Sequence, residues 1–433
     1  MALARKALFE AKTADAVARA GIADLPRGGK WISEIRQTAL MRLHAQGMPG
    51  RRDEYWKFTR PDDLASRDSI PAKLLVTDEK PMFTDIDRLR LVFVDGVFDA
   101  EQSDPLVEEN LEIETLAEAG ARDIHWARDL YGVLVQRGQS PVDRPFATLN
   151  TAIAAEGVVI RVTGKVARPV SLHYKRKNAH SDAWLHNLIK VEIGGDVTLL
   201  ENGPAAARIN TVLEVDVADG GAFHHVRAQG RDHERRATTH IFARLGTEST
   251  FKSFTLTVNG ALTRNECVIE LLGDDAHATV AGASVGDGVF HQDDTVFITH
   301  DAINCESRQV FKKVLRNGAT GVFQGKILVK AGAQKTDGYQ ISQGLLLDDD
   351  SQFLAKPELE IYADDVACSH GSTVGAIDEN ALFYLMSRGI PRALAQNMLV
   401  LSFLAAALEE IEADPLRDDI RDRLERWVER HHA

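Results

Sequence analysis

A cysteine and a histidine stand two residues apart in the stretch ADDVACSHGSTVG, which runs from Ala363 to Gly375. The stretch is typical of a strand followed by a glycine turn, and alternate side chains of a strand share one face. Cys368 and His370 would then present a thiolate and an imidazole together, ligands suited to zinc, iron or an iron–sulfur cluster. Two ligands do not complete a tetrahedral site. The pair is therefore either half of a metal site, or a small buried thiol beside a hydrogen-bonded histidine.

Other residue patterns that could do chemistry are weaker. The sequence has no GxxxxGK[ST] phosphate loop and no HExxH. The acidic run Asp348–Asp350 lacks the glycine-rich repeat of calcium-binding solenoids, so we interpret it as a solvated turn. The neighbours His224 and His225 must face opposite sides of one strand and cannot form a single site. Cys368 and His370 remain the candidate metal ligands.

The overall composition is that of an ordinary soluble protein. The 433 residues are 44% apolar and 27% charged, with a net charge of −13 and no long basic block. This argues against nucleic acid or an anionic membrane as the main partner. The three cysteines (Cys267, Cys305 and Cys368) are scattered, which favours a reducing, cytoplasmic setting. The apolar run Met398–Leu408 is too short for a membrane span, which needs about twenty residues.

The first 150 residues are predicted to be mostly helical. Candidate helices cover Ala2–Arg19 and Lys30–Ala45, each ended by glycine or proline signals. The basic and aromatic stretch PGRRDEYWKFTR follows, and we interpret it as a loop that packs Trp56 and Phe58 on the domain. An isolated strand is expected at Leu89–Phe98, whose nearly continuous apolar run indicates cover on both faces.

The middle region, residues 151–375, loses the helical period and shows many short β-branched runs separated by turn residues. Gly194, Gly220, Gly246 and Gly273 follow at steps of 26, 26 and 27 residues. Strands at a nearly constant interval, without helices between them, fit a sandwich or a solenoid. The steady step favours coils that climb a parallel β-helix. Such a stack has unpaired strand edges at its ends, which helices or another chain must cover.

Residues 376–433 return to helix. Gly389 and Pro391 mark the end of one helix and the start of the next. The helix expected over Leu394–Ile411 is apolar almost all round, so it must be buried on its own domain or in a partner. A third helix places Leu416, Ile420, Leu424 and Trp427 on one stripe.

Three phrases together carry a family resemblance. They are the early RRDEYWKFT, the stretch GVFQGKILVKAGAQKTDGYQ at Gly321–Gln340, and the long block LLLDDDSQFLAKPELEIYADDVACSHGSTVGAIDENALFYLMSRGI at Leu345–Ile390. In this order they resemble the SufB/SufD family of iron–sulfur cluster assembly proteins, more its SufD branch than SufB. The resemblance implies a mainly β protein. A right-handed parallel β-helix core (151–375) would lie between an N-terminal helical domain (1–150) and a C-terminal helical domain (376–433).

The resemblance also implies a function. The chain would be a scaffold without catalytic turnover, in a complex with SufB and the ATPase SufC. Cys368 and His370 would meet a cysteine and an acidic residue of SufB and help hold a nascent, transient iron–sulfur cluster. The helices over Asp378–Ile411 would dock SufC. The family is also associated with reduced flavin in the whole complex, and such chains pair with themselves through the β-helix edge when SufB is absent.

Three other interpretations stay open. A SufB-like chain would itself build the cluster, but should be longer and carry Glu-His-Glu where this one has Cys368-Ser369-His370. A β-helix enzyme acting on polysaccharides would need a row of carboxylates along one face, and no convincing row is present. A structural solenoid that only associates with itself is the third.

Overall fold

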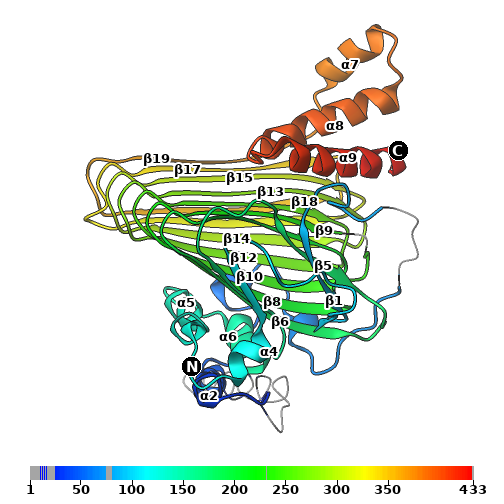
Figure 1. Cartoon of the computed structure of the whole chain (residues 1–433). Coiled ribbons are helices and arrows are strands. Elements are labelled where there is room, and N and C mark those ends of the chain that lie inside the picture. Colours follow the sequence, from blue (N-terminus) through cyan, green and yellow to red (C-terminus); the bar gives the residue numbers. More distant parts are fainter. Residues whose placement is uncertain are drawn as a thin grey trace.

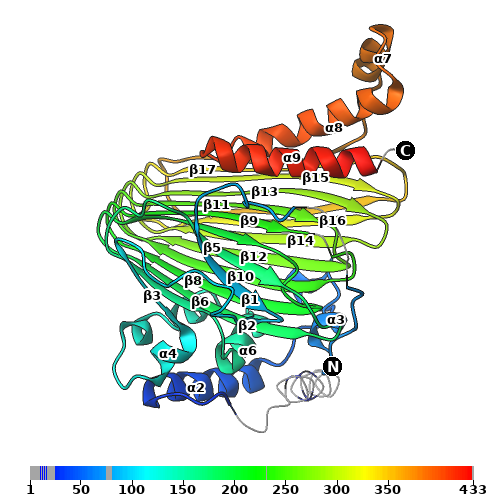
Figure 2. The same cartoon turned by 45° about the vertical axis from the view of Figure 1, so that its right-hand side comes forward.

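Strands dominate the computed structural model, which describes residues 25–74, 80–230 and 232–431 together with residues 10, 12, 14 and 16. Long strands stack into a solenoid, with the N-terminal helices on one side and the C-terminal helices on another (Figure 1). Figure 2 shows the helix α7 (Glu379–Ser387) projecting away from this stack. The predicted helix at Ala2–Arg19 lies outside the described residues apart from the four single positions.

One sheet of the solenoid has ten strands, and its pairings are parallel except for the hairpin β1–β2. In spatial order its strands are β19 (Ala367–Gly375), β17 (Asp337–Leu346), β15 (Glu306–Arg316), β13 (His277–Asp287), β11 (Thr250–Val258), β9 (Ala222–Gln229), β7 (Asp196–Asn202), β5 (Val170–Lys175), β1 (Leu89–Val94) and β2 (Val97–Phe98). We call it the odd sheet.

The second sheet has nine strands, parallel except for the pair β3–β4. Its order is β18 (Gln352–Ile361), β16 (Thr320–Val329), β14 (His291–His300), β12 (Leu262–Leu271), β10 (Arg236–Leu245), β8 (Arg208–Val217), β6 (Asp182–Val191), β4 (Val158–Val162) and β3 (Leu111–Thr115). We call it the even sheet. From β4 onward the chain alternates between the two sheets, so the predicted β-solenoid core is confirmed.

The length of one coil explains the spacing of Gly194 and Gly220. It does not explain Gly246 and Gly273, which lack the positive φ of these turns, and the step from Arg208 to its partner Arg236 is 28 residues. Asp182 pairs with Arg208, 26 residues further on, and Arg236 pairs with Leu262 at the same step. Gly194 and Gly220 take φ angles of +66° and +63° at turns, a conformation that glycine adopts without strain. Later coils are longer, because Thr320 pairs with Gln352, 32 residues further on. The repeat therefore fades toward the C-terminus although the stack continues.

Apolar side chains fill the space between the sheets. Phe311 of the odd sheet and Phe323 of the even sheet have ring centroids 4.9 Å apart within this interior cluster. The outer face of the odd sheet packs residues such as Phe254 against Leu404 and Trp427 of the C-terminal helices. Burial on both faces explains the nearly continuous apolar runs of these strands.

Helices cover the outer faces of both sheets. On the even sheet, Phe242 packs with Tyr131 and Leu134 from the N-terminal region. The helices are α2 (Lys30–Gln46), the 3₁₀ turn η1 (Glu54–Trp56), α3 (Asp62–Ala65), α4 (Leu116–Ala121), the 3₁₀ turn η2 (Trp126–Asp129), α5 (Val133–Arg137), α6 (Pro145–Ile153), α7 (Glu379–Ser387), α8 (Arg392–Leu408) and α9 (Asp414–Arg430). The helix predicted at Lys30–Ala45 is confirmed as α2.

The strand expected at Leu89–Phe98 is not isolated, which corrects the prediction. Its first part, β1, pairs in parallel with β5 and joins the odd sheet, and its last residues form β2 after a turn at Asp95 and Gly96. Leu89, Leu91 and Phe93 belong to the interior cluster. The apolar run is therefore explained by membership of the solenoid, which recruits β1, β2 and β3 from before residue 151.

The three C-terminal helices follow the sequence prediction. The Asp378 side chain caps α7 by accepting from the backbone N–H of Asn380 and Ala381. Gly389 takes φ +85° between α7 and α8. The predicted stripe of α9 is buried on the odd sheet. Among the described residues, the chain has no helix with both the length and the apolar character that crossing a bilayer requires.

Candidate functional site

Cys368 and His370 lie on β19, the last strand of the odd sheet. They pair in register with Gly338 and Gln340 of β17, so the four positions share one face. A methyl group placed on Gly338 would lie 3.2 Å from Cys368 Sγ and 3.4 Å from Ile327 Cγ2 of the even sheet. Cys368 and His370 therefore share a face as predicted, and this face is the inner face of the final coil.

The two side chains differ in exposure. Cys368 is half-buried and packs on a small apolar cluster that includes Ile327 and Val329, whereas His370 is exposed. Burial raises the pKa of the Cys368 thiol, a backbone hydrogen bond from Gly338 opposes this, and the Asp337 carboxylate adds to the rise. The thiol is thus protonated at neutral pH, and binding of a metal would have to release that proton.

The chain alone offers too few ligands for a closed metal site. Within the part of the chain that the structure describes, no group of three or more histidine, cysteine, aspartate or glutamate side chains could hold a metal ion. The other two cysteines, Cys267 and Cys305, are buried in earlier coils. Cys368 and His370 can thus supply at most two ligands, which fits half of a site that a second molecule completes.

The strands that carry this pair also leave the end of the solenoid open. β18 and β19 are the terminal strands of the two sheets, and no described strand pairs with their outer edges. Exposed apolar side chains lie here, among them Ile361, Tyr362 and Val374. At the opposite end, the sheets finish in the short antiparallel strands β2 and β3, which leave shorter edges. An open edge of this length invites pairing with another chain.

A second exposed surface lies on the projecting helices. Phe383, Tyr384 and Met386 of α7 are 72%, 56% and 39% exposed, and Leu394 and Met398 of α8 are 51% and 43% exposed. We call these five residues the helical arm patch. The helix α7, which carries three of them, projects from the stack (Figure 2). The other side of α8 packs on the odd sheet, so α8 is buried on one face only. Clustered exposed apolar side chains mark interaction surfaces.

The early phrase RRDEYWKFT covers a buried ionic network on the even sheet. Trp56 is buried, with the Arg264 guanidinium 4.2 Å from its ring centroid, which confirms the expected packing of this residue. Arg264 pairs with Glu266 at 2.6 Å and also with Asp293. Thr59 Oγ1 donates to Asp293 Oδ2 at 2.6 Å. This network could not be predicted from local sequence patterns, because its residues lie on neighbouring coils and on a distant loop.

The stretch GASVG at Gly282–Gly286 matches the GxSxG pattern of hydrolases and was not among the predicted sites. The structure places it inside β13 and not at a strand-to-helix turn. Ser284 is buried, and its hydroxyl donates to Gln292 Oε1 at 3.3 Å. The strand context removes the exposed nucleophile that such a motif needs.

Two buried histidines make the stability of the fold depend on pH. Burial lowers the pKa values of His240 and His300 to about 4. Between that value and the usual 6.5 the unfolded chain binds more protons, so stability is complete above pH 6.5 and falls as the pH drops toward 4. We expect each histidine to account for about 2 kcal/mol of lost stability between pH 7 and pH 5.

Urea unfolding of the wild type and of His300→Gln at both pH values measures this effect. The variant should lose less stability on acidification than the wild type. The surface variant His277→Gln should lose as much stability on acidification as the wild type, because His277 is exposed. Equal pH responses of His300→Gln and the wild type would contradict the assignment.

Comparisons with known proteins identify relatives of this chain. The family model described as "SUF system FeS cluster assembly, SufBD core domain" matches residues 174–403, more than half of the chain. The iron–sulfur cluster assembly protein SufD of Escherichia coli (strain K12) is 27% identical over 406 residues, covering 90% of this chain and 91% of its own. SufD of Bacillus subtilis (strain 168) is 27% identical over 296 residues, covering 66% and 67%.

A plant protein extends the comparison. The chloroplastic protein ABCI7 of Arabidopsis thaliana is 29% identical over 247 residues, covering 54% of this chain and 51% of its own. The region that the family model matches runs from the end of β5 through most of α8. It therefore includes the open end, Cys368, His370 and the helical arm patch. The chain belongs to the SufBD family of iron–sulfur cluster assembly proteins.

Proposed function

We propose that the chain is a SufD-type assembly subunit that pairs with SufB through the open end of its solenoid and with the ATPase SufC through its C-terminal helices. The observation that carries the proposal is the position of Cys368 and His370 on the last strand, at the end of the solenoid that lacks a cap. The family relationship supports iron–sulfur cluster assembly as the process, and the sequence resemblance supports the SufD role.

The pairing with SufB uses the backbone of β18 and β19. Each terminal strand presents a row of unpaired N–H and C=O groups, and a strand of a second solenoid satisfies them by extending the sheet. In the absence of SufB, a second copy of this chain uses the same edge. The homodimer and the pair with SufB therefore exclude each other, and adding SufB to a self-associated sample should convert one into the other.

The nascent cluster is cargo that this chain and SufB hold together at their interface. Cys368 serves as a thiolate ligand, and His370 serves as an imidazole ligand or as the acceptor of the thiol proton. A cysteine and an acidic residue of SufB complete the site. The free cysteines Cys267, Cys305 and Cys368 suit a reducing compartment, so we assign the complex to the cytoplasm.

SufC docks on the helical arm patch. Nucleotide binding and hydrolysis in SufC then move the arm and open the joint between SufB and this chain, which turns over no substrate itself. The arm suits this role because α7 packs on α8 and has a single buried residue, Leu382, so its other side chains are available to a partner.

The docking surface gives a direct prediction. The substitution Phe383→Asp should weaken SufC binding about tenfold or more, because an exposed aromatic anchor is replaced by a charge that would be buried in the interface. Isothermal titration of SufC into the purified chain measures the change. The control Ile124→Asp alters a side chain that is 92% exposed and outside the arm, and should bind SufC normally. Equal weakening by both variants would contradict docking on the arm.

Co-purification tests the whole proposal. Tagged SufC and SufB should retain this chain, and the complex should contain iron and sulfide after reconstitution. Retention of SufC without SufB would indicate the SufB-like alternative, in which the chain builds the cluster itself. Failure to retain either protein, with release of reducing sugars from a polysaccharide, would indicate the enzyme alternative.

A further inference from the structure

A small cavity with several polar side chains in its wall lies between the sheets, away from Cys368 and His370. Its volume is about 30 Å³, and its walls include Glu201, Thr211, Arg227, Arg235 and Thr239. These residues lie where the strands of the odd sheet end and the next strands of the even sheet begin. A cavity needs about 10–15 Å³ to hold one water molecule, so this one has room for a single small ion.

Two arginines in the cavity wall have donors that nothing satisfies. Arg227 and Arg235 are 6% and 2% exposed. Considering the described residues only, Nε of Arg227 and both Nε and Nη1 of Arg235 have no hydrogen-bond partner. Arg235 Nη2 donates to Thr263 Oγ1 at 3.1 Å, which uses only one corner of the guanidinium. Buried donors without acceptors are rare in native proteins, so these three call for an acceptor inside the cavity.

The charges around the cavity do not balance. Asp232 pairs with Arg176 at 2.9 Å, and both side chains are almost fully buried. Glu201 is buried, and the positive charge of nearby Arg227 helps to lower the pKa of the Glu201 carboxyl. The cavity wall itself holds two arginines, Arg227 and Arg235, and one carboxylate, Glu201. An uncompensated buried charge is strongly unfavourable.

Two other buried ionic networks of this fold are balanced. Beneath the early loop, Arg144 and Arg264 meet Glu266 and Asp293. Further along the interior, Lys313 pairs with Asp294 at 2.7 Å. The cavity at Arg227 and Arg235 therefore differs from both networks in having an excess of one cation.

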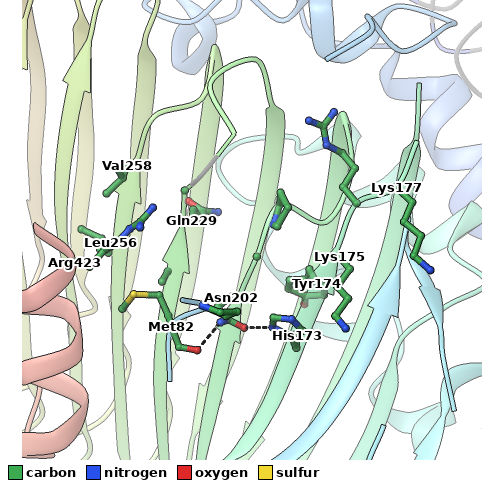
Figure 3. A pocket seen from close by; sticks show the side chains of 16 residues that line it. Met82, His173, Tyr174, Lys175, Lys177, Asn202, Gln229, Leu256, Val258 and Arg423 are labelled. Carbon is green, nitrogen blue, oxygen red and sulfur yellow. Dashed lines mark hydrogen bonds between the residues drawn. The ribbon is translucent and has the colours of Figure 1, made fainter. Parts of the chain in front are cut away.

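A basic cleft lies directly outside the cavity wall. It has a volume of about 340 Å³ on the outer side of the odd sheet, and His173, Lys175, Lys177 and Arg423 line it (Figure 3). Cleft and cavity share Tyr174, Asn202, Gly203, Ala228 and Gln229 as walls. Lysine and arginine side chains at the rim of a cleft raise the local concentration of anions.

We propose that this cavity binds one small inorganic monoanion of halide size, held by Arg227 and Arg235. A single negative charge neutralises the excess cation and accepts from the three unsatisfied donors. The anion is a structural ligand that fixes the turn between the two sheets, and it is independent of the cluster cargo.

Bromide is the probe that tests the proposal. Crystals of the full-length protein soaked in sodium bromide should show an anomalous difference peak between Arg227 and Arg235. In solution, replacing gluconate by bromide at constant ionic strength should raise Tm by about 2 °C once bromide reaches ten times its Kd. The variant Arg235→Met should lose both signals.

The neighbouring residue supplies a matched control. Arg236 faces outward and donates to Asp63 Oδ2 at 2.7 Å, so Arg236→Met should keep the peak and the bromide response. Absence of a peak in the wild-type cavity, or bromide found only on surface lysines, would overturn the proposal even if Arg235→Met fails to fold. Equal bromide responses of the wild type and Arg235→Met would overturn it as well.

Discussion

Replacing Cys368 by alanine in the complex with SufB and SufC should lower its iron and sulfide content about tenfold or more, while the three proteins still assemble. Among the described residues Cys368 is the one cysteine at the open end, so under the proposed function its thiolate would be the soft ligand that this chain gives to the cluster. Anaerobic reconstitution followed by iron and sulfide analysis measures the loss. His370→Ala should also lower cluster content, since the imidazole lies on the same face of β19.

Ser369 is the matched control because it lies between the two residues and faces the other side of the strand. The variant Ser369→Ala should assemble and load iron like the wild type. Unchanged iron and sulfide in both Cys368→Ala and His370→Ala would refute the ligand roles. Loss of SufB binding in these variants would instead assign the pair to the joint itself.

Replacing Arg264 by methionine should destabilise the fold by about 3–5 kcal/mol, which is the cost of breaking a buried ion pair from one side. Arg264 is 1% exposed and is the shared partner of Glu266 and Asp293. Its loss leaves two carboxylates short of a counter-charge and removes the cation stacked on Trp56. Urea unfolding monitored by tryptophan fluorescence measures the change in free energy.

Two further variants separate the causes. Arg244→Met removes a bidentate pair with Asp216 whose side chains are partly exposed, and should cost about 1 kcal/mol or less. Adding Asp293→Asn to Arg264→Met should restore part of the lost stability, because one stranded charge disappears. A loss from Arg264→Met no larger than that from Arg244→Met would contradict the buried network.

Much of the architecture could be predicted from local sequence patterns. The step between Gly194 and Gly220 equals the length of an early coil, because a turn that needs positive φ recurs at the same place in these two coils. The stripe on α9 and the signals at Gly389 and Pro391 marked the C-terminal helices, since these features depend on neighbouring residues only. The shared face of Cys368 and His370 followed from the two-residue period of a strand.

Contacts between distant segments could not be predicted from such patterns. The sequence could not show that β1 joins β5, that Arg264 lies under Trp56, or that Arg227 and Arg235 share a cavity, because each pair depends on how the coils stack. It also could not show which end of the solenoid presents the longer strand edges, since that depends on β2 and β3 joining the first strands of the two sheets. Residue spacing within one strand or helix is set by backbone geometry, which is why the sequence determined it. Pairing between coils is set by the packing of the whole stack, and only the tertiary structure decided it.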